Sequence, residues 1–203
     1  MPQMQLYNEF QSLLDESLEE APLQSFLERN SDIIVDTFCQ GAHYPVVFPK
    51  FRLADEFIPD FVMIGHRSGA SWDVDLIEIE PAVLSGKLFN RQHQTTGRLR
   101  IAEGQVDQWQ IWMGRNRDFF MRRAIDRILN EHLWDRSPFF NTVTRNDISL
   151  MVWYRIVIGR RRDFDTWGNQ YRTNIWRNSS NRLEIVTWDR LLDKARQIGS
   201  RTS

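Results

Sequence analysis

Residues 57–81 read Phe57-Ile58-Pro59-Asp60-Phe61-Val62-Met63-Ile64, then a polar break from His66 to Ser71, then Trp72-Asp73-Val74-Asp75-Leu76-Ile77-Glu78-Ile79-Glu80-Pro81. Two runs rich in Val, Ile and aromatic residues around a Ser/Gly break are typical of a β-hairpin. Pro81 has no N–H to donate to a neighbouring strand, so we expect the second strand to end there.

The hairpin would bring acidic side chains together. Strand side chains alternate between the two faces of a sheet, so Glu78 and Glu80 share one face. If the hairpin folds near the middle of the break, residue 60 lies opposite residues 77 to 78, with a register tolerance of about one position. We therefore expect Asp60 and Glu78 to be cross-strand neighbours.

Three neighbouring acids beside apolar residues raise one another's pKa values unless a cation neutralises them. Oxygen ligands favour Mg²⁺ or Mn²⁺, and Mg²⁺ usually takes one or two carboxylates together with water and a substrate phosphate. We assign Asp60 and Glu78 as metal ligands and Glu80 as the group that orients the attacking water. The pattern predicts metal-assisted phosphodiester hydrolysis.

The acids also have simpler interpretations, because a lone carboxylate on a strand is usually solvated. Asp73 and Asp75 fall on the opposite face of the second strand, where we expect them to be solvated or salt-bridged. A register shift of one position would bring them into the site instead. Each of Glu9, Glu16 and Glu28, in the helical segments near the N-terminus, is a possible auxiliary acid.

Pro59-Asp60 followed by Glu78-x-Glu80 resembles the core of the PD-(D/E)xK nucleases, and the chain resembles in more detail the Shedu-type nucleases of bacterial antiviral defence. The resemblance covers roughly residues 20 to 198. Four further segments follow the family's order along the chain: Phe26-Leu27-Glu28-Arg29-Asn30, Gln105-Val106-Asp107-Gln108-Trp109, Ile156-Val157-Ile158-Gly159-Arg160 and Glu184-Ile185-Val186-Thr187-Trp188-Asp189-Arg190-Leu191-Leu192.

The resemblance implies a metal-dependent DNA endonuclease that acts in anti-phage defence. It favours a catalytic role for Gln105, which lies next to the apolar stripe of a helix and would bond the attacking water or a phosphate oxygen. The alternatives are a core-edge amide at Gln105 and the same role for Gln108. The family usually has Lys where this chain has Glu80, although some restriction endonucleases with this core use Glu there. A catalytically inactive module that binds nucleic acid or a partner, and an RNA nuclease, are the competing interpretations.

The net charge of −1 conceals a strong asymmetry between the two parts of the chain. Residues 1–80 carry 4 Lys+Arg against 15 Asp+Glu, and residues 81–203 carry 22 against 12. Nearly all the basic residues are arginines, whose planar fork matches phosphate oxygens. We expect nucleic-acid contacts from five of them, namely Arg122, Arg123, Arg160, Arg161 and Arg162. Salt bridges between the two parts, a dimer interface and solvated loops are the alternatives.

The order of the expected elements predicts a three-layer α/β/α domain with a mixed central sheet. These elements are helices near residues 6–18 and 23–29, an edge strand or extended connection at 45–49, the hairpin, a loop at 82–94, a helix at 99–113, a second helical stretch at 115–133 separated by a break near Gly114 and Asn116, a strand at 148–158, a helix at 163–177 interrupted near Gly168, a strand at 183–187 and a final helix.

Length and composition fit one domain over residues 1–203, with 41% hydrophobic residues. The chain has no apolar run of about 18 residues and no signal-peptide pattern. A single cysteine, Cys39, excludes an intrachain disulfide. We expect a soluble cytoplasmic protein that does not bind membranes. Cleavage of two strands needs two sites, so we also expect a homo-oligomer.

Overall fold

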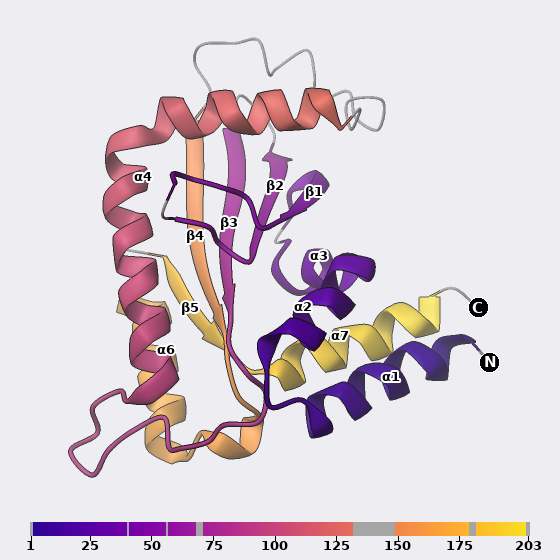
Figure 1. Cartoon of the computed structure of the whole chain (residues 1–203), viewed down its shortest axis with the longest axis vertical. Helices are drawn as coiled ribbons and strands as arrows, with labels where there is room; N and C mark the ends of the chain where they lie inside the picture. Colours follow the sequence, from indigo (N-terminus) through magenta and orange to yellow (C-terminus); the bar gives the residue numbers. More distant parts are fainter. Residues whose placement is uncertain are drawn as a thin grey trace.

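A computed structural model describes residues 2–39, 41–55, 57–67, 71–131, 149–178 and 182–201. At its centre lies a five-stranded sheet with the order β1-β2-β3-β4-β5 (Figure 1). The first three strands pair antiparallel and the last two join in parallel, so the sheet is mixed as predicted. The strands are β1 (His43–Pro49), β2 (Phe61–Arg67), β3 (Ser71–Ile79), β4 (Ser149–Val157) and β5 (Leu183–Val186).

Helices cover both faces of this sheet and complete the predicted three-layer α/β/α architecture (Figure 1). One face carries α1 (Pro2–Glu16), α2 (Glu20–Arg29), α3 (Asp32–Phe38) and α7 (Trp188–Arg201). The other carries α4 (Gly97–Asn130) and α6 (Thr166–Asn178). None of the helices in the described part of the chain combines the length and apolar character needed to cross a bilayer.

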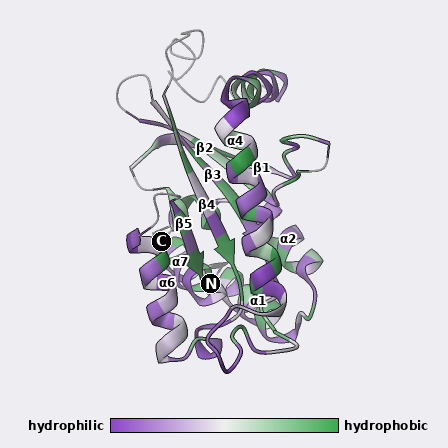
Figure 2. Cartoon of the chain, turned by 90° about the vertical axis from the view of Figure 1, so that its left-hand side faces the viewer, coloured by the Kyte–Doolittle hydropathy of each residue, from purple (hydrophilic) through white to green (hydrophobic). Residues whose placement is uncertain are grey.

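Alternation along β3 divides the apolar core between the two faces. Trp72, Val74 and Leu76 pack in the cluster beneath α4, whereas Ile77 and Ile79 pack in the cluster beneath α1 and α7. Figure 2 shows hydrophobic residues along the strands of the sheet and an alternation of hydrophobic and hydrophilic residues along α4. Each buried side chain of this size stabilises the fold by about 1.5–3 kcal/mol. The predicted assignment of faces is confirmed.

The β2–β3 hairpin has the predicted register. Phe61 lies opposite Ile77 and Arg67 lies opposite Ser71, although residues 68–70, where the turn was expected, lie outside the described residues. Continued by one position, this register sets Asp60 opposite Glu78. The predicted edge strand is also confirmed, because β1 pairs only with β2 in the described sheet and contains Pro45 near an irregularity in its register.

The break predicted near Gly114 and Asn116 is a kink within α4. Asn116 has non-helical backbone angles (φ −128°, ψ 27°), and its side-chain Nδ2 donates a hydrogen bond to Trp112 O at 2.9 Å. A side-chain donor that competes with the backbone for a carbonyl is a recognised cause of bending. The second half of α4 therefore turns away from the first half and crosses the end of the sheet (Figure 1).

The interruption predicted near Gly168 is wrong, because α6 runs without a break from Thr166. The Gly168 N–H donates to Asp165 Oδ1 at 2.8 Å, which satisfies one free donor of the first helical turn. Gly168 instead permits close packing, since an added Cβ would lie 2.9 Å from a ring carbon of Phe89. The turns expected at Ser137-Pro138 and near Ser179 lie outside the described residues.

We predict that Gly168→Ala lowers the free energy of unfolding by about 1–3 kcal/mol, because the new methyl group overpacks the contact with Phe89. Gly104→Ala is the matched control, since nothing lies within 4 Å of its Cβ position in α4. The control should stabilise the protein by up to about 1 kcal/mol through helix propensity. Urea unfolding of both variants measures the difference, and equal effects would contradict the packing role of Gly168.

Candidate active site

The three acids predicted for the site lie at one edge of the sheet. Asp60 directly precedes β2, Glu78 is near the end of β3, and Glu80 follows β3. Their exposed fractions are only 6%, 8% and 3%, so none is an ordinary solvated carboxylate. The charges of Asp60 and Glu80 both act on Glu78. The hairpin therefore brings all three together, as the sequence predicted.

Asp60 is held by its backbone and by both carboxylate oxygens. Its Oδ2 accepts a hydrogen bond from the Ile79 N–H at 2.8 Å, and its Oδ1 forms an ion pair with Lys50 Nζ. Its backbone carbonyl accepts hydrogen bonds from Lys50 N at 2.8 Å and from Gln24 Nε2 at 3.3 Å. The carboxylate is thus fixed across the strand pair, with one oxygen on the ammonium group.

Lys50 is a site residue that the sequence analysis missed. It follows β1 with a φ of 46°, in the left-handed region that non-glycine residues rarely adopt. Such strain is concentrated at functional sites. Pairing of Pro49 with Phe61 carries Lys50 to Asp60, so a correct register for β1 would have revealed the contact.

Burial is the main reason that Glu78 and Glu80 hold their protons strongly. Burial, reinforced by the charges of Asp60 and Glu80, raises the pKa of Glu78 to about 9, although Lys50 partly offsets the rise. Burial and the charge of Glu20 raise the pKa of Glu80 to about 8 against the opposing effect of Arg98. Both carboxyl groups are therefore mainly protonated at neutral pH in the protein alone.

Two charged residues from helix starts complete the site. Arg98, in the first turn of α4, places Nη1 3.2 Å from Glu20 Oε1 and 3.5 Å from Glu80 Oε2. Burial and the charge of Asp60 raise the pKa of Glu20. Glu20 is therefore the fourth acid at this edge. The auxiliary acids considered from the sequence have other partners: Glu9 contacts Arg29, Glu16 contacts Ser12 and Glu28 contacts Gln24.

Gln105 is half-buried in α4, about two helical turns after Arg98. Within the described part of the chain, no hydrogen bond joins its side chain to Asp60, Glu78 or Glu80. In this structure α4 instead presents Arg98 to the acids. The catalytic role of Gln105 stays a prediction.

Asp73 and Asp75 are salt-bridged, which is one of the two states expected, but they are buried rather than solvated. Asp73 pairs with Arg67, and Asp75 Oδ1 lies 2.7 Å from Arg155 Nε. Burial raises the pKa of Asp75 to about 6 despite Arg155. Arg155 also pairs with Glu184, so Asp75 belongs to a separate internal network, whereas the partner of Asp73 is Arg67.

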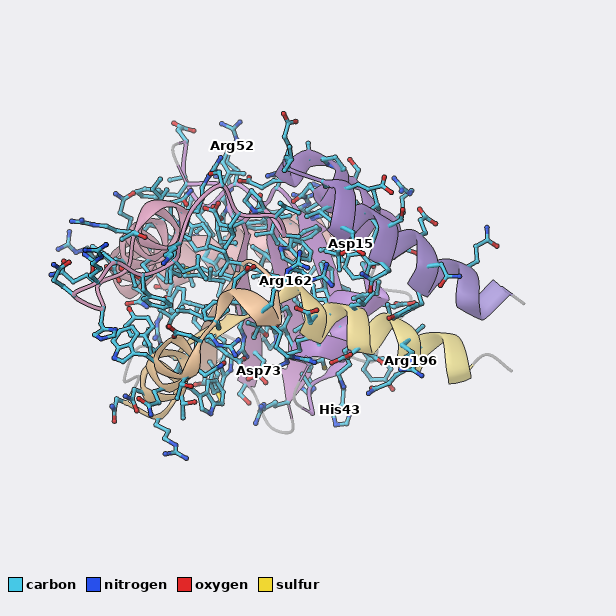
Figure 3. The ribbon with its side chains drawn as sticks, turned by 90° about the horizontal axis from the view of Figure 1, so that it is seen from below. Asp15, His43, Arg52, Asp73, Arg162 and Arg196 are labelled. Atoms are coloured by element: carbon cyan, nitrogen blue, oxygen red, sulfur yellow. The ribbon has the colours of Figure 1, made fainter. Side chains whose placement is uncertain are left out.

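The arginine cluster after β4 departs from its expected role at Arg160. This guanidinium is buried, with Nη1 2.7 Å from Asp15 Oδ1 and Nη2 3.1 Å from Asp189 Oδ1. Arg160 therefore links α1 to α7. Because its guanidinium is buried in these ion pairs, we no longer propose that it contacts nucleic acid. Hydrogen bonds from Gln11 and Arg160, with the charge of nearby Arg162, lower the pKa of Asp15 (Figure 3). Arg161 pairs with Asp193 at 2.8 Å.

A basic groove of about 610 Å³ begins at Lys50. Arg52, Arg123 and Arg127 line it, together with Asp126 and Glu131. Arg122, which was also predicted to contact nucleic acid, is exposed on α4 but is not among the lining residues. Arg123 therefore combines the predicted charge with a position in a groove that reaches the acidic site.

The acids fit a hard divalent cation in their chemistry, because every candidate ligand atom is oxygen. Glu80 Oε2 is buried and accepts no hydrogen bond from any described residue. No group of three or more His, Cys, Asp or Glu in the described residues is arranged to hold a metal ion. Mg²⁺ typically takes one or two carboxylates together with water and substrate oxygens, and the oxygen donors of Asp60 and Glu78 are compatible with that chemistry.

A protein-family comparison agrees with the extent of this fold. The family model described as "Shedu protein SduA, C-terminal" matches residues 17–192. The matched range includes all four acids, Lys50 and the basic groove. No curated protein matches the chain.

We predict that Glu78→Gln stabilises the metal-free protein at alkaline pH. A carboxyl group whose pKa rises on folding stabilises the fold fully below its unfolded pKa of about 4.5, and this contribution is lost as pH approaches the folded value of about 9. The variant should be more stable than the wild type by several kcal/mol at pH 9, with a smaller difference at pH 5. Denaturant unfolding with a chelator measures this difference. Glu16→Gln, exposed on α1, is the control, and a pH-independent effect of Glu78→Gln would contradict the assignment.

Proposed function

Since the chain belongs to the Shedu SduA C-terminal family, we propose that it is a metal-dependent endonuclease of the PD-(D/E)xK type that cleaves DNA in anti-phage defence. The observation that carries the proposal is that the buried side chains of Asp60, Glu78 and Glu80 cluster where β2 begins and β3 ends. Clustered acids with strongly raised pKa values are a signature of functional sites. The adjoining basic groove supports a polyanionic substrate.

In the proposed reaction, Asp60 and Glu78 hold Mg²⁺ or Mn²⁺. The bound ion would polarise a phosphoryl oxygen and lower the pKa of a coordinated water. Glu78 must lose its proton to become a ligand, and Lys50 must give up its contact with Asp60 Oδ1 to expose that oxygen. Metal binding would have to supply the free energy for both changes, because Glu78 has a pKa of about 9 and the half-exposed Lys50 forms an ion pair with Asp60.

Glu80 would orient the attacking water and, once it has lost its own proton, would accept the proton of that water. A general base works best when its pKa is close to the operating pH, and the pKa of Glu80 is about 8. Arg98 keeps this carboxyl in place at 3.5 Å without a direct hydrogen bond to Oε2. Gln105 remains the candidate for a second contact to the water or a phosphate oxygen.

Lys50 supplies the positive charge that the usual lysine would provide at position 80. Once released from Asp60, its ammonium group lies between the acids and the basic groove, where negative charge develops on the phosphate. The change to Glu80 is therefore compatible with activity, because Lys50, directly after β1, reaches the same edge of the sheet.

The groove binds the phosphate backbone through arginines on α4. Arg127 lies over the rings of Phe48 and Phe51, 5.0 and 5.7 Å from their centres, so its guanidinium is held in position. Arg52 lies on the connection that follows β1, at the surface (Figure 3). Arg122 and Arg162 extend the contact outside the groove. Two such sites in a homo-oligomer would cleave both strands of a duplex.

A non-catalytic module that binds nucleic acid is the second candidate function. It is favoured by the protonated state of Glu78 and Glu80 at neutral pH, which resists metal binding. Both candidate functions use the basic groove to bind nucleic acid. Only the nuclease also needs Asp60, Glu78 and Glu80.

The deciding experiment incubates the protein with linear duplex DNA and Mg²⁺ or Mn²⁺, with single-stranded RNA as a parallel substrate. Asp60→Ala and Glu78→Ala should each reduce DNA cleavage by at least about 10²-fold and spare DNA binding, and a chelator should stop it. Lys50→Met should slow cleavage with metal binding retained. Glu9→Ala, an exposed acid on α1, is the control. DNA that is bound but stays intact with both metals would favour the non-catalytic module.

We further predict that Arg123→Gln weakens DNA binding at every sequence tested and lowers the slope of log affinity against log salt by about 1. The reason is the loss of one phosphate contact in the groove. Binding titrations at several salt concentrations, in the Asp60→Ala background, measure the slope. Arg196→Gln, on α7 outside the groove, should leave it unchanged (Figure 3). Equal slopes for Arg123→Gln and the wild type would exclude Arg123 from the interface.

A further inference from the structure

A second cavity, of about 370 Å³, opens between α6, β5 and α7. It shares no lining residue with the basic groove or with the four acids of the candidate active site. Its volume falls in the range of small-molecule pockets. Three arginines line it, Arg161, Arg172 and Arg190, together with hydroxyl groups and a tryptophan.

Arg172 is a guanidinium whose position is fixed by neighbouring side chains. Its Cζ lies 4.4 Å from the centre of the Phe164 ring, and its Nη2 donates to Asn169 Oδ1 at 2.7 Å. No described carboxylate lies within ion-pair distance of it, and its buried Nε has no hydrogen-bond partner among the described residues. Burial and the charges of Arg161 and Arg190 lower the pKa of Arg172, although the charge of Glu184 partly opposes the change. This position therefore favours an anion.

The other two arginines keep donors for the same anion. Arg161 Nη2 pairs with Asp193 at 2.8 Å, and Arg190 Nη1 pairs with Glu184. Each guanidinium has five N–H donors in a planar fork, so one carboxylate partner does not use them all. With two acids against three arginines, the cavity retains a net positive charge, which suits a phosphate group.

Trp176 gives the cavity an aromatic surface. Its side chain is 38% exposed, although large apolar side chains are usually covered. It is stacked with Trp153, with ring centres 5.7 Å apart, so its orientation is fixed. Thr173, from the preceding turn of the same helix, adds a hydroxyl group to the lining.

We propose that this cavity binds a free nucleotide, with its phosphate on Arg172, Arg161 and Arg190 and its base against Trp176. Guanidinium groups recognise phosphate oxygens in bidentate fashion, and aromatic rings stack on bases of any sequence. The assignment is independent of metal-dependent cleavage, because none of its residues belongs to the acid site.

Calorimetric titration of the intact protein with AMP, ADP and ATP, in the presence of a chelator, tests the proposal. Arg172→Gln should weaken the binding by about tenfold or more, through loss of charged hydrogen bonds. Arg161→Gln, whose side chain is mostly exposed and whose loss should not unfold the protein, should weaken it as well. Arg177→Gln is the matched control, because Arg177 is exposed on α6 and does not line the cavity.

The proposal would be overturned by no binding of any of the three nucleotides, by equal affinity for adenosine and its phosphates, or by binding of a 5′-phosphorylated oligonucleotide alone. Unchanged affinity in both Arg172→Gln and Arg161→Gln would also overturn it. Asp60→Ala should retain nucleotide binding, so failure of the nuclease assay and failure of this inference can be told apart.

Discussion

The antiparallel pairing of β2 with β3 fixes the positions of Asp60, Glu78 and Glu80, three of the four acids in the candidate site. Phe61 opposite Ile77, and the hydrogen bond from Ile79 N–H to Asp60 Oδ2, hold Asp60 against the end of β3. A slip of one residue would turn every side chain of a strand to the other face. The apolar residues on both faces of β3 prevent that slip, because each set has its own helix layer to pack against.

The protein neutralises its buried acids in two different ways. Asp75 lies in a network with Arg155 and Glu184, in which arginines sit directly on the carboxylates. Glu78 and Glu80 have weaker compensation, and the consequence is a pKa of about 9 for the first and about 8 for the second. Buried acids that lack a strong ion-pair partner lower the free energy of unfolding. Functional sites commonly carry such a loss of stability. This contrast distinguishes the candidate active site from the structural network.

Local patterns in the sequence were enough to predict the hairpin, its two faces, the edge strand and the break in the long helix. They failed where the outcome depends on contacts between distant segments. Arg160 pairs with Asp15 from α1, and Arg98 brings Glu20 into the site from another helix. No periodicity encodes such pairs. The contact between Lys50 and Asp60 could have been predicted from the sequence if the register of β1 against β2 had been assigned. The metal, the substrate and the role of Gln105 depend on groups outside the chain.

Direct measurement of metal binding tests the central claim, that the hairpin edge is a divalent-cation site. Mn²⁺ titration by calorimetry at pH 7, repeated in buffers of different ionisation enthalpy, counts the protons released per ion bound. The account predicts a site that releases protons, because Glu78 must ionise to become a ligand, and that is lost in Glu78→Gln. Binding without proton release, or equal binding by the variant, would contradict it.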